Sequence, residues 1–178
     1  PESTWLATYD ADSLARTGFR PAPDPGVQPI YGYAVASDDE HTYLFGNTFD
    51  QNLADQGGFF GGPHSARLMY LARVARGQLA ARPEYWTGQG WSSAARDAAP
   101  ISDRFAPENP MQPRYLDGRW VAATKAGGYW GDELVIDVAA NAWGPWHVAE
   151  RRPLRPRGGD PLMNTYHARL MPWLANGE

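Results

Sequence analysis

A repeated pattern is the feature that most constrains the fold of this 178-residue chain. Three short segments align without gaps, starting at Leu6, Leu71 and Val135, so that successive copies lie about 64 residues apart. Regular spacing of this kind is typical of proteins built from similar units that bury their apolar faces against one another. The repeat therefore predicts a chain of successive, structurally similar units.

A hairpin is expected at the start of each unit. Segments that fit this pattern are 31–36 with 42–45, 111–116 with 120–123, and 166–170, which leads to Asn176-Gly177. The second pair is separated by Asp117-Gly118. This dipeptide is a strong hairpin signal, because both central residues of such a turn need positive φ. The sequence thus predicts antiparallel strands joined by tight turns.

Four antiparallel strands are expected in each unit: the hairpin, a third strand and an outer fourth strand. Four-stranded sheets at a fixed spacing are typical of propeller blades. We therefore expect an all-β fold, a partial β-propeller of about three blades that is cut inside a blade at both ends. The expected limits are 1–25 for the end of one blade, 26–95 for the second, 105–155 for the third and 160–178 for the start of a further blade. The alternative is a compact β-sandwich of two facing sheets with Greek-key crossovers.

Composition narrows the function classes. The net charge of −4 argues against a general nucleic-acid-binding domain. The absence of Cys excludes thiolate metal sites and Cys nucleophiles. No apolar run reaches the roughly 18 residues needed to span a bilayer. The four His lack metal-ligand spacing, and no phosphate-loop or dinucleotide motif is present, so we expect neither a metal nor a cofactor.

Propeller geometry predicts where a ligand would bind. Loops between the second and third strands share one face with the connections that lead into each first strand. The segments grouped on this face are 46–65, 126–132, the residues near Tyr31, 108–112 and 164–167. Loops that converge beside the central channel are the expected ligand site.

Glu108 is the candidate catalytic acid on this face, because it precedes an innermost strand. Acid-assisted hydrolysis by two carboxyl groups needs a proton donor and a second carboxylate, which here would come from outside the chain. The alternative is an exposed loop glutamate. The candidate substrate-binding residues are Asn47, Asp50, Asn109, Gln112, Tyr129, Trp130, Tyr166 and His167. Exposed rings such as Tyr129 and Trp130 can stack on sugar C–H faces, whereas the five Trp at 86, 91, 120, 143 and 146 are expected to pack between blades.

Several segments resemble a bacterial propeller family, domain-of-unknown-function family 4185, which includes the endo-D-arabinanases of glycoside hydrolase family 183. The similar segments are 30–35, 43–46, 70–74, 85–91, 144–146 and 166–168. The resemblance covers nearly the whole chain and implies about three of five blades, from the C-terminal part of a protein roughly twice as long. It also implies that the main catalytic carboxylates lie in a first blade outside this chain. Asn47 stands where a first-blade strand of the family carries the Asp of Gly-Asp-Thr, so we interpret it as part of a later blade.

The resemblance implies part of a glycoside hydrolase acting on a bacterial cell-wall polysaccharide, an endo-D-arabinanase. The implied protein is secreted or in the cell envelope, is a monomer when full-length, and has an arabinan-type polysaccharide as its partner. The alternative is a non-catalytic propeller that binds carbohydrate or protein, because fold alone does not give function. Unpaired edge strands favour association, so we expect the chain by itself to be inactive and poorly soluble.

Overall fold

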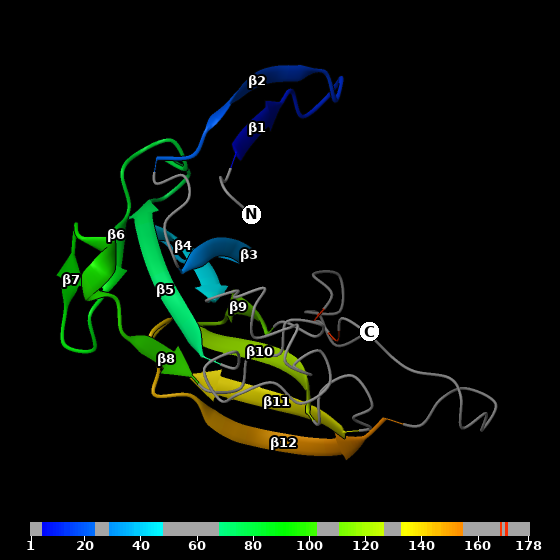
Figure 1. The fold of residues 1–178 in the computed structure, drawn as a ribbon. Helices are drawn as coiled ribbons and strands as arrows, with labels where there is room; N and C mark the ends of the chain where they lie inside the picture. Colours follow the sequence, from blue (N-terminus) through cyan, green and yellow to red (C-terminus); the bar gives the residue numbers. More distant parts are fainter. Residues whose placement is uncertain are drawn as a thin grey trace, which may run out of the picture.

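The computed structural model describes residues 5–23, 29–47, 68–102, 111–126, 133–154, 168 and 170. Regular structure in these residues consists of strands, apart from one short 3-10 turn, η3 (Ala95–Asp97). The strands form three antiparallel sheets (Figure 1). Within the described residues, no helix has the length and apolar character needed to cross a membrane.

Sheet 1 is a hairpin of β1 (Trp5–Tyr9) and β2 (Arg16–Pro21). Its turn is held by Asp10, whose carboxylate accepts hydrogen bonds from the Ser13 amide at 2.8 Å and the Ser13 hydroxyl at 2.7 Å. The rings of Trp5 and Phe19 stack across the two strands with centroids 4.9 Å apart. The Leu6 segment, expected to be a third strand of its unit, lies in β1.

Sheet 2 contains the first predicted hairpin and its continuation. Its strands are β3 (Ile30–Ser37), β4 (His41–Asn47), β5 (Met69–Ala75), β6 (Glu84–Trp86) and β7 (Trp91–Ser92), in sequence order, with β8 (Pro100–Ser102) paired to β5. The turn between β3 and β4 falls at 38–40, between the two segments predicted to pair. Because β8 joins this sheet, sheet 2 extends beyond residue 95, where the second blade was expected to end.

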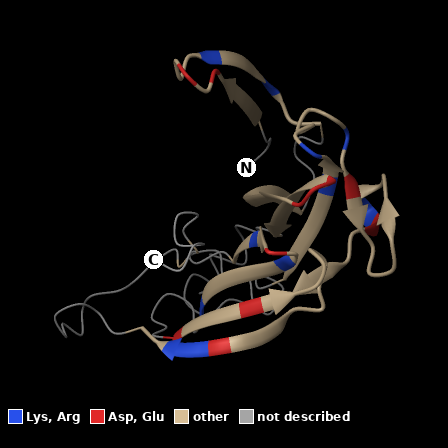
Figure 2. Cartoon of the chain, turned by 180° about the vertical axis from the view of Figure 1, so that it is seen from behind, with Lys and Arg blue, Asp and Glu red and all other residues tan. Residues whose placement is uncertain are grey.

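Sheet 3 contains the second predicted hairpin. It consists of β9 (Gln112–Leu116), β10 (Arg119–Ala126), β11 (Glu133–Ala139) and β12 (His147–Pro153), each paired with the next. Asp117 and Gly118 have φ values of 49° and 78°, the positive values that the Asp-Gly signal predicts. Every residue of β12 is exposed, and its charges are paired: Arg151 with Glu133 and Arg152 with Glu150 (Figure 2). Such charges discourage pairing with a foreign strand at an outer edge.

Sheet 3 has the four consecutive antiparallel strands expected of a propeller blade, whereas sheet 2 has six strands and sheet 1 has two, so the expected four strands are not found in every unit. The prediction of an all-β, partial propeller-like fold is confirmed. The innermost strands β3 and β9 of sheets 2 and 3 lie close together. The further blade expected at 160–178 falls outside the described residues except for Ala168 and Leu170.

Alternation along the strands builds the core between sheets 2 and 3. Tyr43 and Phe45 point from β4 toward sheet 3, where Trp120 lies with 1% of its surface exposed. The Trp120 ring centroid is 5.1 Å from that of Tyr43 and 6.0 Å from that of Phe45. Aromatic rings supply large apolar area and favourable edge contacts, so this contact holds the two sheets together.

A second aromatic group joins the same two sheets near β6 and β7. Trp143, which precedes β12, stacks on Trp86 with centroids 5.1 Å apart and meets Trp91 edge-on at 5.8 Å. The Arg73 guanidinium lies 4.1 Å from the Trp91 ring centroid and forms an ion pair with Glu84 at 2.9 Å. The expected packing of tryptophans between sheets is confirmed, since these three rings and Trp120 and Trp146 belong to, or pack against, one core cluster.

Asp38 holds the turn between β3 and β4. Its carboxylate accepts hydrogen bonds from the backbone amides of Glu40 at 2.9 Å and His41 at 2.8 Å. Partial burial alone would raise the pKa of Asp38, but these hydrogen bonds outweigh it and hold the pKa below its usual value of 3.8. Burial and a hydrogen bond with Asp38 also raise the pKa of Tyr43 far above its ordinary range.

We expect Asp38→Asn to lower the free energy of unfolding by about 1 kcal/mol at pH 7, because the variant loses charge-assisted hydrogen bonds. A carboxylate whose pKa is lower in the folded state stabilises the protein above its unfolded pKa, and this stability is lost as pH falls through the folded pKa. The difference in free energy of unfolding between the variant and the wild type should therefore become smaller below pH 3.8. Urea unfolding at pH 7 and pH 3 measures it. Asp39→Asn is the control, because the ion pair of Asp39 with Arg76, at 3.5 Å, is exposed. Equal losses of unfolding free energy in both variants would contradict the role assigned to Asp38.

Candidate functional site

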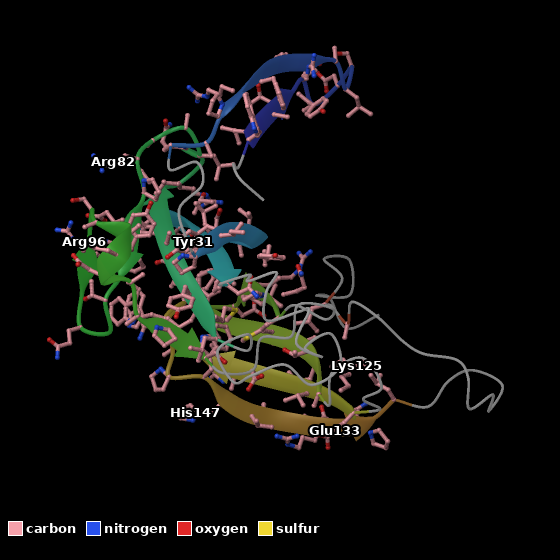
Figure 3. All side chains as sticks on the ribbon, viewed as in Figure 1. Tyr31, Arg82, Arg96, Lys125, Glu133 and His147 are labelled. Atoms are coloured by element: carbon pink, nitrogen blue, oxygen red, sulfur yellow. The ribbon has the colours of Figure 1, made fainter. Side chains whose placement is uncertain are left out.

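The candidate site lies at the end of sheet 2 where β4 ends and β5 begins. Asn47 is paired with Met69 on one side and with Ile30 on the other. Ser102 of β8 is paired with Met69 at the same end. In sheet 3, β10 ends at Ala126 opposite Glu133, the first residue of β11 (Figure 3 labels Glu133). These are the sheet ends at which the propeller geometry predicts a ligand.

Asn47 is a fully buried polar residue at this end, with 0% of its surface exposed. Among the described residues, neither the oxygen nor the nitrogen of its side-chain amide has a hydrogen-bond partner. An unpaired buried polar group costs about 1–3 kcal/mol, and such groups in folded proteins are usually satisfied by water or by a ligand. The carboxamide of Asn47 therefore holds one acceptor and two donors that no described residue satisfies.

Local backbone geometry fixes Asn47 in this position. The preceding residue, Gly46, lies so close to β3 that a Cβ there would be 2.2 Å from the Ile30 carbonyl oxygen. The register of β3 against β4 shifts between Tyr31 and Ala34. Glycine is thus required where the two backbones approach, and the residue that follows is held between Ile30 and Met69.

Two further polar side chains are buried on the side of sheet 3 that faces sheet 2. Thr124 lies on the same face as Trp120, four residues along β10, and its hydroxyl has no hydrogen-bond partner among the described residues. Asp137 is fully buried and is paired with Ala122, between these two positions. Sequence reasoning did not select Thr124 or Asp137. Alternation along β10 and β11 places both residues on one face, which is recognised as the inward face once the facing sheet is known.

Gln112 belongs to a different environment from Asn47. It is paired with Ala123, on the face of sheet 3 opposite to Trp120 and Thr124. It lines a pocket of about 210 Å³ between β3 and β9, together with Ser37, Arg114 and Tyr115 among others. The structure therefore places Gln112 near the innermost strands but does not bring it together with Asn47.

The other predicted site residues lie outside the described residues: Glu108, Asp50, Asn109, Tyr129, Trp130, Tyr166 and His167. Their roles stay predictions. The described carboxylates are mostly engaged in turns and ion pairs, as Asp38, Glu84 and Glu133 show. In the described part of the chain, no group of three or more His, Asp or Glu side chains could hold a metal ion.

The described residues thus define an all-β protein of propeller-like antiparallel sheets, in which the side chains of Asn47 and Thr124 are buried without a hydrogen-bond partner among the described residues. A family model described as "Domain of unknown function (DUF5005)" matches residues 1–175. The match covers nearly the whole chain, and the chain belongs to this family. No curated protein matches the sequence.

Proposed function

We propose that this chain forms part of a glycoside hydrolase acting on a bacterial cell-wall polysaccharide, an endo-D-arabinanase in a secreted or cell-envelope protein. The observation that carries the proposal is the buried, unpaired carboxamide of Asn47 at the expected ligand end of sheet 2. The resemblance of segments such as 43–46 to the arabinanase-containing propeller family 4185 supplies the substrate class.

The chemistry of Asn47 suits a sugar. Each sugar hydroxyl can donate and accept a hydrogen bond, and the carboxamide can accept through its oxygen and donate through its nitrogen at the same time. An amide has no proton to transfer at neutral pH and is a weak nucleophile, so Asn47 binds and orients the substrate without taking part in bond cleavage. Glu108 is the proposed proton donor to the leaving oxygen, and the second carboxylate would come from a part of the protein outside this chain.

A second candidate is a propeller that binds carbohydrate without cleaving it. The engagement of Glu84 and Glu133 in ion pairs favours it, because neither of these two carboxylates is then free to act as a proton donor or nucleophile. Hydrolysis requires two such groups on either side of the scissile bond. An assay of the longest polypeptide that contains this chain, incubated with D-arabinan, distinguishes the two functions. Release of short oligosaccharides supports the hydrolase. Binding of arabinan without release of oligosaccharides supports the binding protein.

Asn47→Ala tests the role of this residue in either case. We expect the variant to bind D-arabinan oligosaccharides about tenfold more weakly in titration calorimetry, because two hydrogen bonds to the sugar are lost. The unliganded variant should keep its stability within about 1 kcal/mol, since removal of an unpaired amide offsets the lost packing. Asn141→Ala is the matched control, because Asn141 is exposed in the turn after β11. Unchanged binding by Asn47→Ala, or equal weakening by both variants, would rule out the proposed role.

A further inference from the structure

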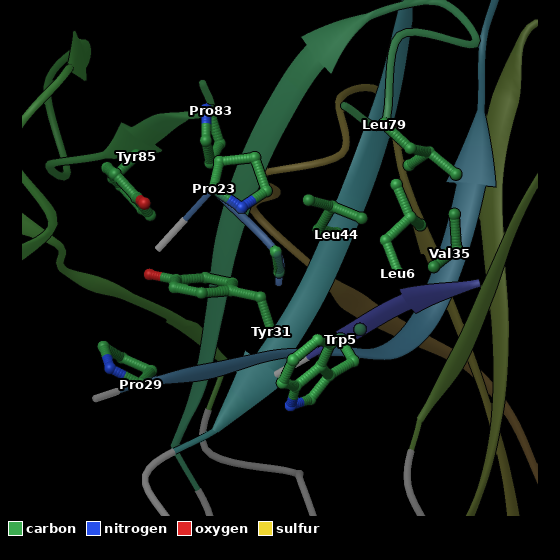
Figure 4. A pocket seen from close by; sticks show the side chains of 12 residues that line it. Trp5, Leu6, Pro23, Pro29, Tyr31, Val35, Leu44, Leu79, Pro83 and Tyr85 are labelled. Carbon is green, nitrogen blue, oxygen red and sulfur yellow. The ribbon is translucent and has the colours of Figure 1, made fainter. Parts of the chain in front are cut away.

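A second pocket lies on the opposite face of sheet 2, between that sheet and the β1–β2 hairpin (Figure 4). Its volume is about 240 Å³. Leu44 lines it, and alternation along β4 turns Leu44 away from sheet 3, toward which Tyr43 and Phe45 point. The pocket therefore lies on the face of sheet 2 opposite to the one that carries the Asn47 side chain.

The walls of this pocket are aromatic and uncharged. Trp5 from the hairpin and Tyr31 and Tyr85 from sheet 2 supply three rings, and the Tyr31 and Tyr85 centroids are 5.3 Å apart. The remaining described residues that line the pocket are aliphatic, proline or glycine. Such walls suit an apolar, ring-shaped group. The described lining side chains include no amide or carboxylate, the groups that recognise the many hydroxyls of a sugar.

The Tyr85 hydroxyl is a buried polar atom of the pocket wall. Tyr85 has 1% of its surface exposed, and its hydroxyl has no hydrogen-bond partner among the described residues. Figure 4 shows the Tyr85 hydroxyl on the side of the ring that faces Tyr31 and the pocket. A buried hydroxyl without a partner is unfavourable, and a ligand with one hydrogen-bonding group at this position would satisfy it.

The wall beside Tyr31 is also shaped by a bulge. The pairing of β3 with β4 slips between Tyr31 and Ala34, and Gly32 has a φ of 104°. Gly32 lines the pocket, and a Cβ placed there would meet no atom within 4 Å. The bulge thus leaves open space in the wall next to the aromatic rings, as bulges near binding sites do.

We propose that this pocket binds a neutral aryl alcohol or an aryl group bearing a single hydroxyl. The ring lies among Trp5, Tyr31 and Tyr85, and its hydroxyl pairs with the Tyr85 hydroxyl. The absence of charged side chains among the described lining residues disfavours an ionised ligand, because burial of an unpaired charge is costly.

The test compares two fluorinated probes, 4-fluorobenzyl alcohol and 4-fluorotoluene, by ¹⁹F NMR titration of the intact chain. We expect the wild type to bind the alcohol about fivefold more tightly than the toluene, the effect of one neutral hydrogen bond. Tyr85→Phe should abolish this preference while leaving the affinity for 4-fluorotoluene within about twofold. Because Tyr85→Phe removes one oxygen and keeps the ring, the fold should be retained.

The variant Val35→Trp tests whether the probes bind in this pocket. Val35 lines the pocket and is 51% exposed, so a larger ring is tolerated there and should weaken both probes at least about tenfold by occupying space. Val148→Trp is the matched control on β12, at a side chain 38% exposed outside the pocket. Failure of both probes to bind, an alcohol preference that survives Tyr85→Phe, or equal effects of the two Trp variants would overturn the proposal. Competition by methyl arabinofuranoside would also overturn the proposal, since a sugar would then occupy the pocket. Loss of probe binding as the chain dimerises at high protein concentration would overturn it as well, since a second copy would then occupy the pocket.

Discussion

Trp120→Ala is expected to lower the free energy of unfolding by about 3–5 kcal/mol, the cost of removing a large buried ring and leaving a cavity. Trp120 contacts Tyr43 and Phe45 of sheet 2 and Tyr115 of its own sheet, with centroids 5.1, 6.0 and 5.5 Å away. Neighbouring rings on two sheets cannot close the gap without moving the sheets together. Urea unfolding followed by circular dichroism measures the loss of unfolding free energy. If the dependence of that free energy on urea concentration has the same slope in the variant and the wild type, the two unfolding transitions can be compared.

Trp5→Ala is the matched control for this prediction. Trp5 is 50% exposed and stacks on Phe19 at the surface of sheet 1. Its removal should cost no more than about 1 kcal/mol, because surface substitutions leave little buried area unfilled. A loss below about 1 kcal/mol in Trp120→Ala, or equal losses in the two variants, would show that sheets 2 and 3 are not held together by this ring.

Local chemistry explains why the two hairpins could be predicted from the sequence. Asp117 and Gly118 adopt the positive φ values that their turn requires, and the alternating segments on either side pair in the register that this turn sets. Asp38 acts in the same local way, because its carboxylate accepts from amides two and three residues later. The spacing of the repeats then indicated that similar sheets follow one another.

Contacts between distant segments were not predictable in this way. β8 is three residues long and pairs with β5 across a large sequence separation, and nothing in Pro100–Ser102 itself indicates that partner. Asn47 was selected by sequence position on the expected ligand face. Its complete burial without a partner depends on how the sheets pack. Thr124 and Asp137 have polar side chains at inward positions, which alternation reveals only once the facing sheet is known.

The register shift in β3 is a third feature that depends on a close backbone approach. It falls beside Gly46, which is paired with Tyr31. A glycine weakens a strand unless a neighbouring backbone needs the space that a side chain would fill. The role of Gly46, the residue before Asn47, can therefore be recognised only from the structure.

Gly46→Ala is expected to lower the free energy of unfolding by about 3 kcal/mol, at the upper end of the cost of overpacking. A Cβ at Gly46 would lie 2.2 Å from the Ile30 carbonyl oxygen and 2.8 Å from the Tyr31 Cα, and both obstacles are backbone atoms that cannot turn aside as a side chain can. Gly90→Ala is the control, since a Cβ there meets nothing within 4 Å and should be neutral or stabilising by up to about 1 kcal/mol. Thermal and urea unfolding of both variants measure the contrast. If Gly46→Ala is as stable as Gly90→Ala, β3 and β4 do not approach as closely as the bulge requires, and the position of Asn47 at the end of β4 loses its structural basis.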